Sequence, residues 1–124
     1  MKRFASHRLY IPHKNILLRN QVVEISEVGG EVTGYYPFME EIPYTEWMNG
    51  LIVLSYNEPI ISAHTHPDPI NDSVVLYIGL EKEIRSVLPL DSDMTFLTLK
   101  AYYVTMFNVS EVSFSLDSRV IQLC

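Results

Sequence analysis

The stretch QVVEISEVGGEVTGYY, residues 21–36, decides the fold class of this chain. Two runs rich in β-branched and aromatic residues flank Gly29-Gly30, and a glycine pair between two such runs is typical of a β-hairpin turn. Similar short runs recur at 8–11, 50–55, 95–109, 112–116 and 119–123. We therefore predict a chain built of many short strands.

Alternation supports this prediction in the last of these runs. Val112, Phe114 and Leu116 alternate with serines, so a strand over 112–116 would place the three apolar side chains on one face. Asp117-Ser118 follows directly and predicts a tight turn before the run 119–123.

Two stretches differ from this strand pattern. Residues 37–49 hold two prolines and three glutamates around large aromatics, which predicts a connecting loop with a short turn of helix. Residues 67–89 have two interpretations. One is a helix capped by Asn71 or Asp72, and the other is a strand over VVLYI, residues 74–78.

The predicted fold is mainly β: a small β-sandwich or roll with at most one or two short helices. A length of 124 residues fits a single domain spanning 1–124. Such a domain must close the edges of its sheets or cover them. Because self-association covers an edge, we expect a homo-oligomer or a protein partner.

Composition narrows the classes of partner and compartment. The formal net charge is −6 and the nine Lys and Arg are scattered, so we expect no nucleic-acid partner, which would need a basic stripe. No apolar run approaches the roughly 20 residues of a membrane span, so we expect no membrane association. The single cysteine, Cys124, excludes an internal disulfide and fits a reducing compartment, so we expect a cytoplasmic location.

Four stretches, taken in chain order, resemble a known family. They are FASHRLYIPHKNILLRNQVVEISEVGGEVTGYY (4–36), EWMNGLIVLSYNEPIISAHTHP (46–67), GLEKEIRSVLPLDSDMTFLTLK (79–100) and VSFSLDSRVIQLC (112–124). Their order resembles the composite β domain of the metal-dependent hydrolase (amidohydrolase) superfamily, in its chlorohydrolase and cytosine-deaminase-like branch. The sequence departs from that pattern at Leu54-Ser55-Tyr56, where the family has Pro-Gly-Phe, and at Arg85, where it has glycine.

The resemblance implies that N-terminal strands in 1–56 and C-terminal strands in 81–124 combine into one β domain. In the family this domain flanks a catalytic (β/α)₈ barrel, which needs about 200 residues or more. Here only residues 67–78 separate His66 from the returning Gly79 segment, so 57–80 is a connecting segment in place of the barrel. We therefore expect a non-catalytic, stand-alone β domain without a cofactor, acting through association with itself or with a partner.

The motif Ala63-His64-Thr65-His66-Pro67 supports an alternative function. Histidines two residues apart on an extended chain project to the same side, so both imidazoles could bind one cation. Catalytic zinc takes three protein ligands and a water, and Asp68 would be the third ligand. The alternative is a small metal-binding or metal-dependent hydrolytic protein that uses zinc at His64, His66 and Asp68.

The aromatic content bears on association. The sequence has eight Tyr, five Phe and one Trp, and neighbouring aromatics on a strand point in opposite directions. Some must lie at the surface, where Tyr and Trp favour interfaces, or lie under the chain's own loops. Glu40, Glu41 and Glu46 flank Tyr44 and Trp47 and could line a groove, or could form a solvated rim.

Overall fold

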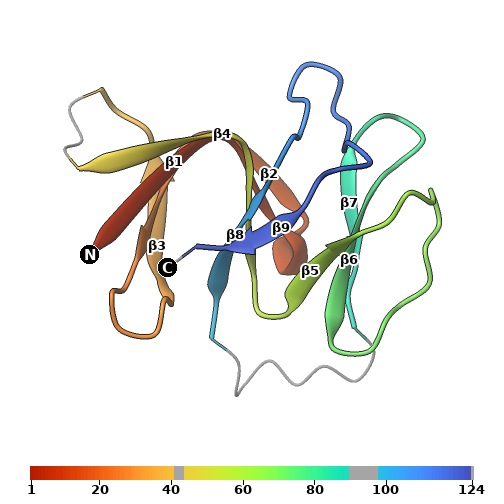
Figure 1. Ribbon diagram of the computed structural model, residues 1–124, viewed down its shortest axis with the longest axis horizontal. Helices are drawn as coiled ribbons and strands as arrows, with labels where there is room; N and C mark the ends of the chain where they lie inside the picture. Colours follow the sequence, from red (N-terminus) through yellow and green to blue (C-terminus); the bar gives the residue numbers. More distant parts are fainter. Residues whose placement is uncertain (41–43, 90–97, 124) are drawn as a thin grey trace.

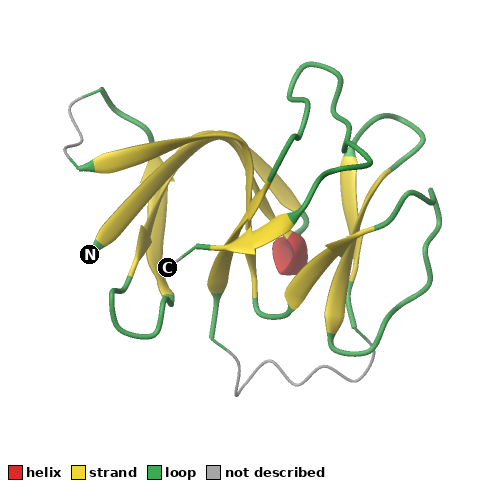
Figure 2. Cartoon of the chain, viewed as in Figure 1, coloured by secondary structure: helices red, strands yellow, loops and turns green. Residues whose placement is uncertain are grey.

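Nine strands and one helical turn make up the described part of the chain. The computed structural model describes residues 1–40, 44–89 and 98–123 (Figure 1). The mainly β prediction is confirmed, and Figure 2 shows one short helical turn among the strands. The elements are β1 (Lys2–Ile11), the 3₁₀ turn η1 (Pro12–Lys14), β2 (Ile16–Ile25), β3 (Val32–Pro37), β4 (Thr45–Ser55), β5 (Glu58–Ile61), β6 (Ser73–Ile78), β7 (Ile84–Val87), β8 (Lys100–Val104) and β9 (Val120–Gln122).

Six strands form the larger sheet, in the order β3-β2-β1-β4-β8-β9. β1, β2 and β3 are joined by hairpins, and Gly29 and Gly30 form the second hairpin turn at φ angles of 81° and 67°. This confirms the turn predicted there. β4 runs parallel to β1, and β8 then pairs antiparallel with β4. The first and last parts of the chain therefore share one sheet.

The six-stranded sheet curls until the start of β3, its edge strand, meets the start of β8. The Val32 N–H donates to Leu99 O at 2.8 Å, Glu31 and Lys100 form an isolated bridge, and the Lys100 ammonium donates to Gly29 O. The inside of the curl, called the inner face here, encloses the first apolar cluster. That cluster consists of Phe4, Leu9, Ile11, Val23, Ile25, Ile52, Leu54, Ala101 and Leu123.

The smaller sheet covers part of the opposite, outer face. Its order is β5-β6-β7, with β5 and β6 parallel. The segment 57–80, expected to be only a connection, thus supplies two of its three strands. It lies at the right of Figure 1. The second apolar cluster fills the space between the sheets: Tyr10, Leu51, Val53, Val74, Leu76, Ile84, Val104 and Phe107.

Tyr10 ties the two sheets together through its hydroxyl group. The ring is 1% exposed, and the hydroxyl donates to Asn15 Oδ1 at 3.1 Å and lies 3.0 Å from Ser86 Oγ on β7. Burial raises the pKa of Tyr10, although the Ser86 hydrogen bond opposes this. The hairpin β1–β2 and the smaller sheet are therefore joined by a neutral hydrogen-bonded phenol.

Of the two interpretations of residues 67–89, the strand is the one observed. β6 occupies 73–78, and Val74, Val75 and Leu76 are all at most 1% exposed, so the run is buried on both faces. Buried runs of this kind lack alternation, which explains why the sequence also fitted a helix. Asp72 has φ 61°, in the left-handed region, and does not begin a helix.

Two loop and strand predictions are wrong. The connecting loop expected over 37–49 gives way to β4 at Thr45, while residues 41–43 lie outside the described residues. The strand expected over 112–116 contains only an isolated bridge, Asn108 to Ser113, and Val112 has φ 51°. Val112 and Phe114 still pack against the second cluster, whereas Leu116 is fully exposed, so hydrophobic contact there comes from a loop.

The long run 95–109 is also shorter as a strand than predicted. β8 covers Lys100–Val104, and Met106 ends the extended chain with φ 56°. The predicted turn at Asp117-Ser118 is present, since the Ser118 N–H donates to Ser115 O at 3.0 Å. Residues 95–97 and Cys124 lie outside the described residues. In the parts of the chain that the structure describes, no helix has the length and apolar character to cross a membrane.

Candidate functional site

The His-x-His motif lies on the loop that joins β5 to β6. The extended chain that the metal hypothesis assumed ends at Ile61, and residues 63–66 form bends. The His64 N–H donates to Ser62 Oγ at 3.1 Å, which tightens the first bend. The two histidines therefore lack the strand geometry that would place both imidazoles on one side.

The three candidate zinc ligands are divided between two hollows. His64 and Asp68 line a hollow of about 390 Å³ beside Ile61 and Val75. His66 lines another, of about 300 Å³, beside Tyr77 and Arg85. Within 1–40, 44–89 and 98–123, no three His, Cys, Asp or Glu side chains gather closely enough to hold a metal ion. A zinc site at His64, His66 and Asp68 stays a prediction.

An aromatic cluster occupies the outer face where the smaller sheet does not reach. Trp47 on β4 contacts His7 on β1 edge-on, with ring centroids 4.7 Å apart, and contacts Phe38, just after β3, at 5.5 Å. Trp47 and Phe38 are 40% and 37% exposed. These three rings, His7, Phe38 and Trp47, are called the aromatic cluster here. β3 lies at the left of Figure 1, on the opposite side of the molecule from the smaller sheet.

Strand register explains how residues distant in sequence form this cluster. Trp47 lies beside Ala5, Ala5 lies beside Val22, and Val22 lies beside Tyr36. Residues opposite one another share a face, and Phe4, next to Ala5, points inward, so this row points outward. Ala5 and Val22, in the middle of this row, are fully buried.

A bulge in β4 positions His7 within the cluster. Between the pairs Ser6–Met48 and Arg8–Leu51, one residue of β1 faces Asn49 and Gly50. Gly50 has φ 112°, and its N–H donates to His7 Nδ1 at 3.2 Å. This bond holds the imidazole against the indole and makes Nδ1 the acceptor. The indole N–H of Trp47 donates to Asn49 Oδ1 at 2.9 Å.

Two arginines lie directly opposite each other beside the cluster. Arg8 and Arg19 are partners in the β1–β2 register, and like charges placed opposite each other are destabilising. Arg8 donates to His7 O at 2.9 Å. Within the described ranges the ion pairs join the N-terminus to Glu27, Arg3 to Glu24, and Arg85 to Glu83, so neither arginine has a carboxylate within ion-pair distance there.

Comparisons of the chain with protein families, with curated proteins and with solved structures find no match. The outer face therefore has to be interpreted from its own chemistry. It combines an exposed indole, an exposed phenyl ring and two arginines without acidic partners among the described residues. Trp and Arg are the residue types that contribute most to protein interfaces.

Sequence reasoning found part of this surface. It expected some aromatics at the surface, and it left open whether the glutamates around Tyr44 and Trp47 line a groove or form a solvated rim. Tyr44 is 93% exposed and Glu46 is exposed, whereas Trp47 packs against His7 and Phe38. It treated the cationic residues as scattered and missed the Arg8–Arg19 pair. The pair follows from the β1–β2 hairpin register, which the sequence alone leaves open.

Proposed function

We propose that this chain is a non-catalytic β domain that acts by association, with a second copy of itself or with another protein, through the outer face of its six-stranded sheet. The observation that supports this most is the aromatic cluster, whose Trp47 and Phe38 rings stay 40% and 37% exposed on the outer face of the larger sheet. A sandwich ordinarily covers such a face with its second sheet. Here a partner would take that place.

The chemistry of the surface suits a protein partner. The aromatic cluster offers apolar area with few rotatable bonds, so little conformational entropy is lost when a partner orders it. His7 is fixed by the Gly50 N–H and Trp47 by Asn49, so two of the three rings are already held in place. Preorganised aromatic groups of this kind lower the entropic cost of binding.

We also propose that the domain derives from the composite β domain of the amidohydrolase superfamily. Two features support this origin. Strands from 1–56 and from 81–124 share one sheet, as the resemblance implies. The His-x-His loop joins β5 to β6 at the place where the barrel would begin, and only residues 62–72 connect the two strands. The proposal of association does not depend on this ancestry.

Photo-cross-linking in the producing cell tests the proposed function. p-Benzoylphenylalanine replaces Trp47 in one variant and Leu116 in a control, because Leu116 is fully exposed on the loop before β9. We expect an adduct of higher mass from position 47 and none from position 116. The same adducts from both positions, or none from position 47, would contradict association through the aromatic cluster.

A further inference from the structure

The turn between β6 and β7 carries side chains that complement those of the outer face. The turn between β6 and β7, residues 79–83, is closed by the Gly79 N–H donating to Glu83 O at 2.8 Å and the Lys82 N–H donating to Gly79 O at 3.0 Å. Leu80 at its tip is 79% exposed, and Glu81 is exposed beside it. This turn therefore presents an apolar side chain next to a carboxylate on a hydrogen-bonded backbone.

Glu81 is the carboxylate of the turn that no described cation holds in an ion pair, although its charge also acts on Arg85. Glu83 is engaged by Arg85, with Nη2 and Oε1 2.6 Å apart. Among the described residues, Glu81 takes part in none of the three ion pairs, as is also true of Arg8 and Arg19. The turn thus carries a negative charge, and the outer face carries positive charges that it could neutralise across an interface.

We propose that the occupant of the outer face is a second copy of this chain, and that its β6–β7 turn binds there. Leu80 of one copy packs against Trp47 and Phe38 of the other, and Glu81 pairs with Arg8 and Arg19. This inference rests on the proposed function and names its partner. Charge complementarity supports it: residues 1–20 carry five Lys or Arg and no acidic residue, whereas 58–85 carry five Asp or Glu against the two cations Lys82 and Arg85.

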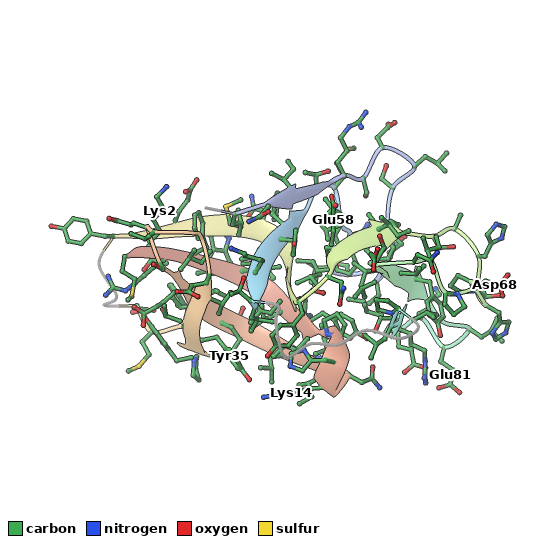
Figure 3. All side chains as sticks on the ribbon, turned by 90° about the horizontal axis from the view of Figure 1, so that it is seen from below. Lys2, Lys14, Tyr35, Glu58, Asp68 and Glu81 are labelled. Carbon is green, nitrogen blue, oxygen red and sulfur yellow. The ribbon has the colours of Figure 1, made fainter. Side chains whose placement is uncertain are left out.

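The two surfaces can be used reciprocally in a two-fold dimer. Each copy then donates one turn and receives one, so the assembly closes and does not extend into a fibre. In Figure 3 the side chains of Lys14, at the tip of the β1–β2 hairpin, and Glu81 lie on the same side of the molecule and at different points along it. That arrangement suits an antiparallel pair, in which the basic hairpin of each copy faces the acidic turn of the other.

A charge-swap experiment tests the inference, because each contact occurs twice in such a dimer. Arg19→Glu and Glu81→Arg are made separately, and both positions are exposed, so folding is retained and is checked by circular dichroism. Each variant alone places like charges in both contacts, and we expect its dimer dissociation constant to rise by about tenfold or more. Mixing the two variants restores opposite charges in both contacts, so native mass spectrometry of the mixture should show the mixed dimer.

Arg119→Glu and Glu111→Arg provide matched controls, because both residues are exposed and lie on the loop between β8 and β9. These variants should dimerise as the unmodified chain does. Unchanged dimerisation of Arg19→Glu and Glu81→Arg, absence of the mixed dimer, or a monomeric unmodified chain would each overturn the inference. If position 47 still forms cross-links in any of these cases, the proposed function stands with a different partner or with a different contact between copies; if it does not, that function fails as well.

Discussion

At the scale of single residues, His13 carries an unsatisfied polar atom. Its ring lies 4.8 Å from that of Tyr56, and its Nδ1 is buried without a hydrogen-bond partner among the described residues. Burial lowers the pKa of His13 below 6.5, and the charge of Lys14 acts in the same direction. The folded protein thus takes up this proton at lower pH than the unfolded chain does. Because folding favours the neutral imidazole of His13, the stability that this neutral form contributes is complete above about pH 6.5. It is lost as pH falls through the folded-state pKa.

His13→Phe should therefore make stability less dependent on pH. The phenyl ring keeps the contact with Tyr56 and removes both the titration and the unpaired nitrogen. Urea unfolding at pH 7.5 and 5.5 measures the effect, and we expect a smaller difference between the two values in the variant. His64→Ala, at an exposed position, is the control and should keep the original difference. An unchanged difference in His13→Phe would refute this assignment.

Tyr10→Phe should destabilise the fold by about 1–2 kcal/mol. The substitution keeps the buried ring but leaves Asn15 Oδ1 and Ser86 Oγ without the hydroxyl that joins them. Chemical denaturation followed by fluorescence measures the loss. Tyr44→Phe, at a position that is 93% exposed, should leave the free energy of unfolding unchanged. Equal stabilities of the two variants would show that the Tyr10 hydroxyl does not connect the sheets.

Gly50→Ala should cost about 1–3 kcal/mol, because a side chain at φ 112° is strained. Steric overlap contributes less to this cost, since an added Cβ would meet Phe107 O at 3.5 Å, an ordinary van der Waals contact. Gly34→Ala is the matched control: this residue also lies in a strand, and an added Cβ would meet nothing within 4 Å. Thermal unfolding should separate the two variants, and a Gly50→Ala variant as stable as Gly34→Ala would contradict the strain argument.

At the scale of elements, the sequence predicted those strands and turns that depend on neighbouring residues alone. The β2–β3 hairpin follows from Gly29-Gly30, and the mainly β character follows from composition. β6 could not be distinguished from a helix because both of its faces are buried. The loop around Val112 fills the core as a strand would, so its alternation was misleading. The pairing of His7 with Trp47 depends on the parallel contact of β1 and β4, which no local pattern encodes.

The β5–β6 loop holds His64 and His66, the residues of the alternative metal-binding hypothesis. Its bends send His64 and His66 to different hollows, so we expect no tight metal binding there. Elemental analysis of untagged, purified protein should find zinc well below one ion per chain. Stoichiometric zinc that disappears in a His64→Ala, His66→Ala double variant would revive the metal-binding hypothesis and show that the loop rearranges around the ion.

At the scale of the whole molecule, the two sheets differ in how they enclose the apolar clusters. The six-stranded sheet encloses one core by curling on itself, and the smaller sheet covers only the half of the outer face around Tyr10, Leu51 and Val53. On the rest of the outer face, Ala5 and Val22 are fully buried, and the rings of the aromatic cluster stay partly exposed. The proposed association would cover these exposed rings, and it would also bring negative charge to the opposed Arg8 and Arg19.

The molar mass of the unmodified chain in solution tests self-association most directly. Light scattering across a hundredfold range of concentration should give a mass that rises from 14.3 kDa toward twice that value. The same series on Trp47→Ala should stay closer to the monomer mass, because the central ring of the aromatic cluster is lost. A mass of 14.3 kDa for the unmodified chain at every concentration would contradict the account of its outer face as a surface for a second copy.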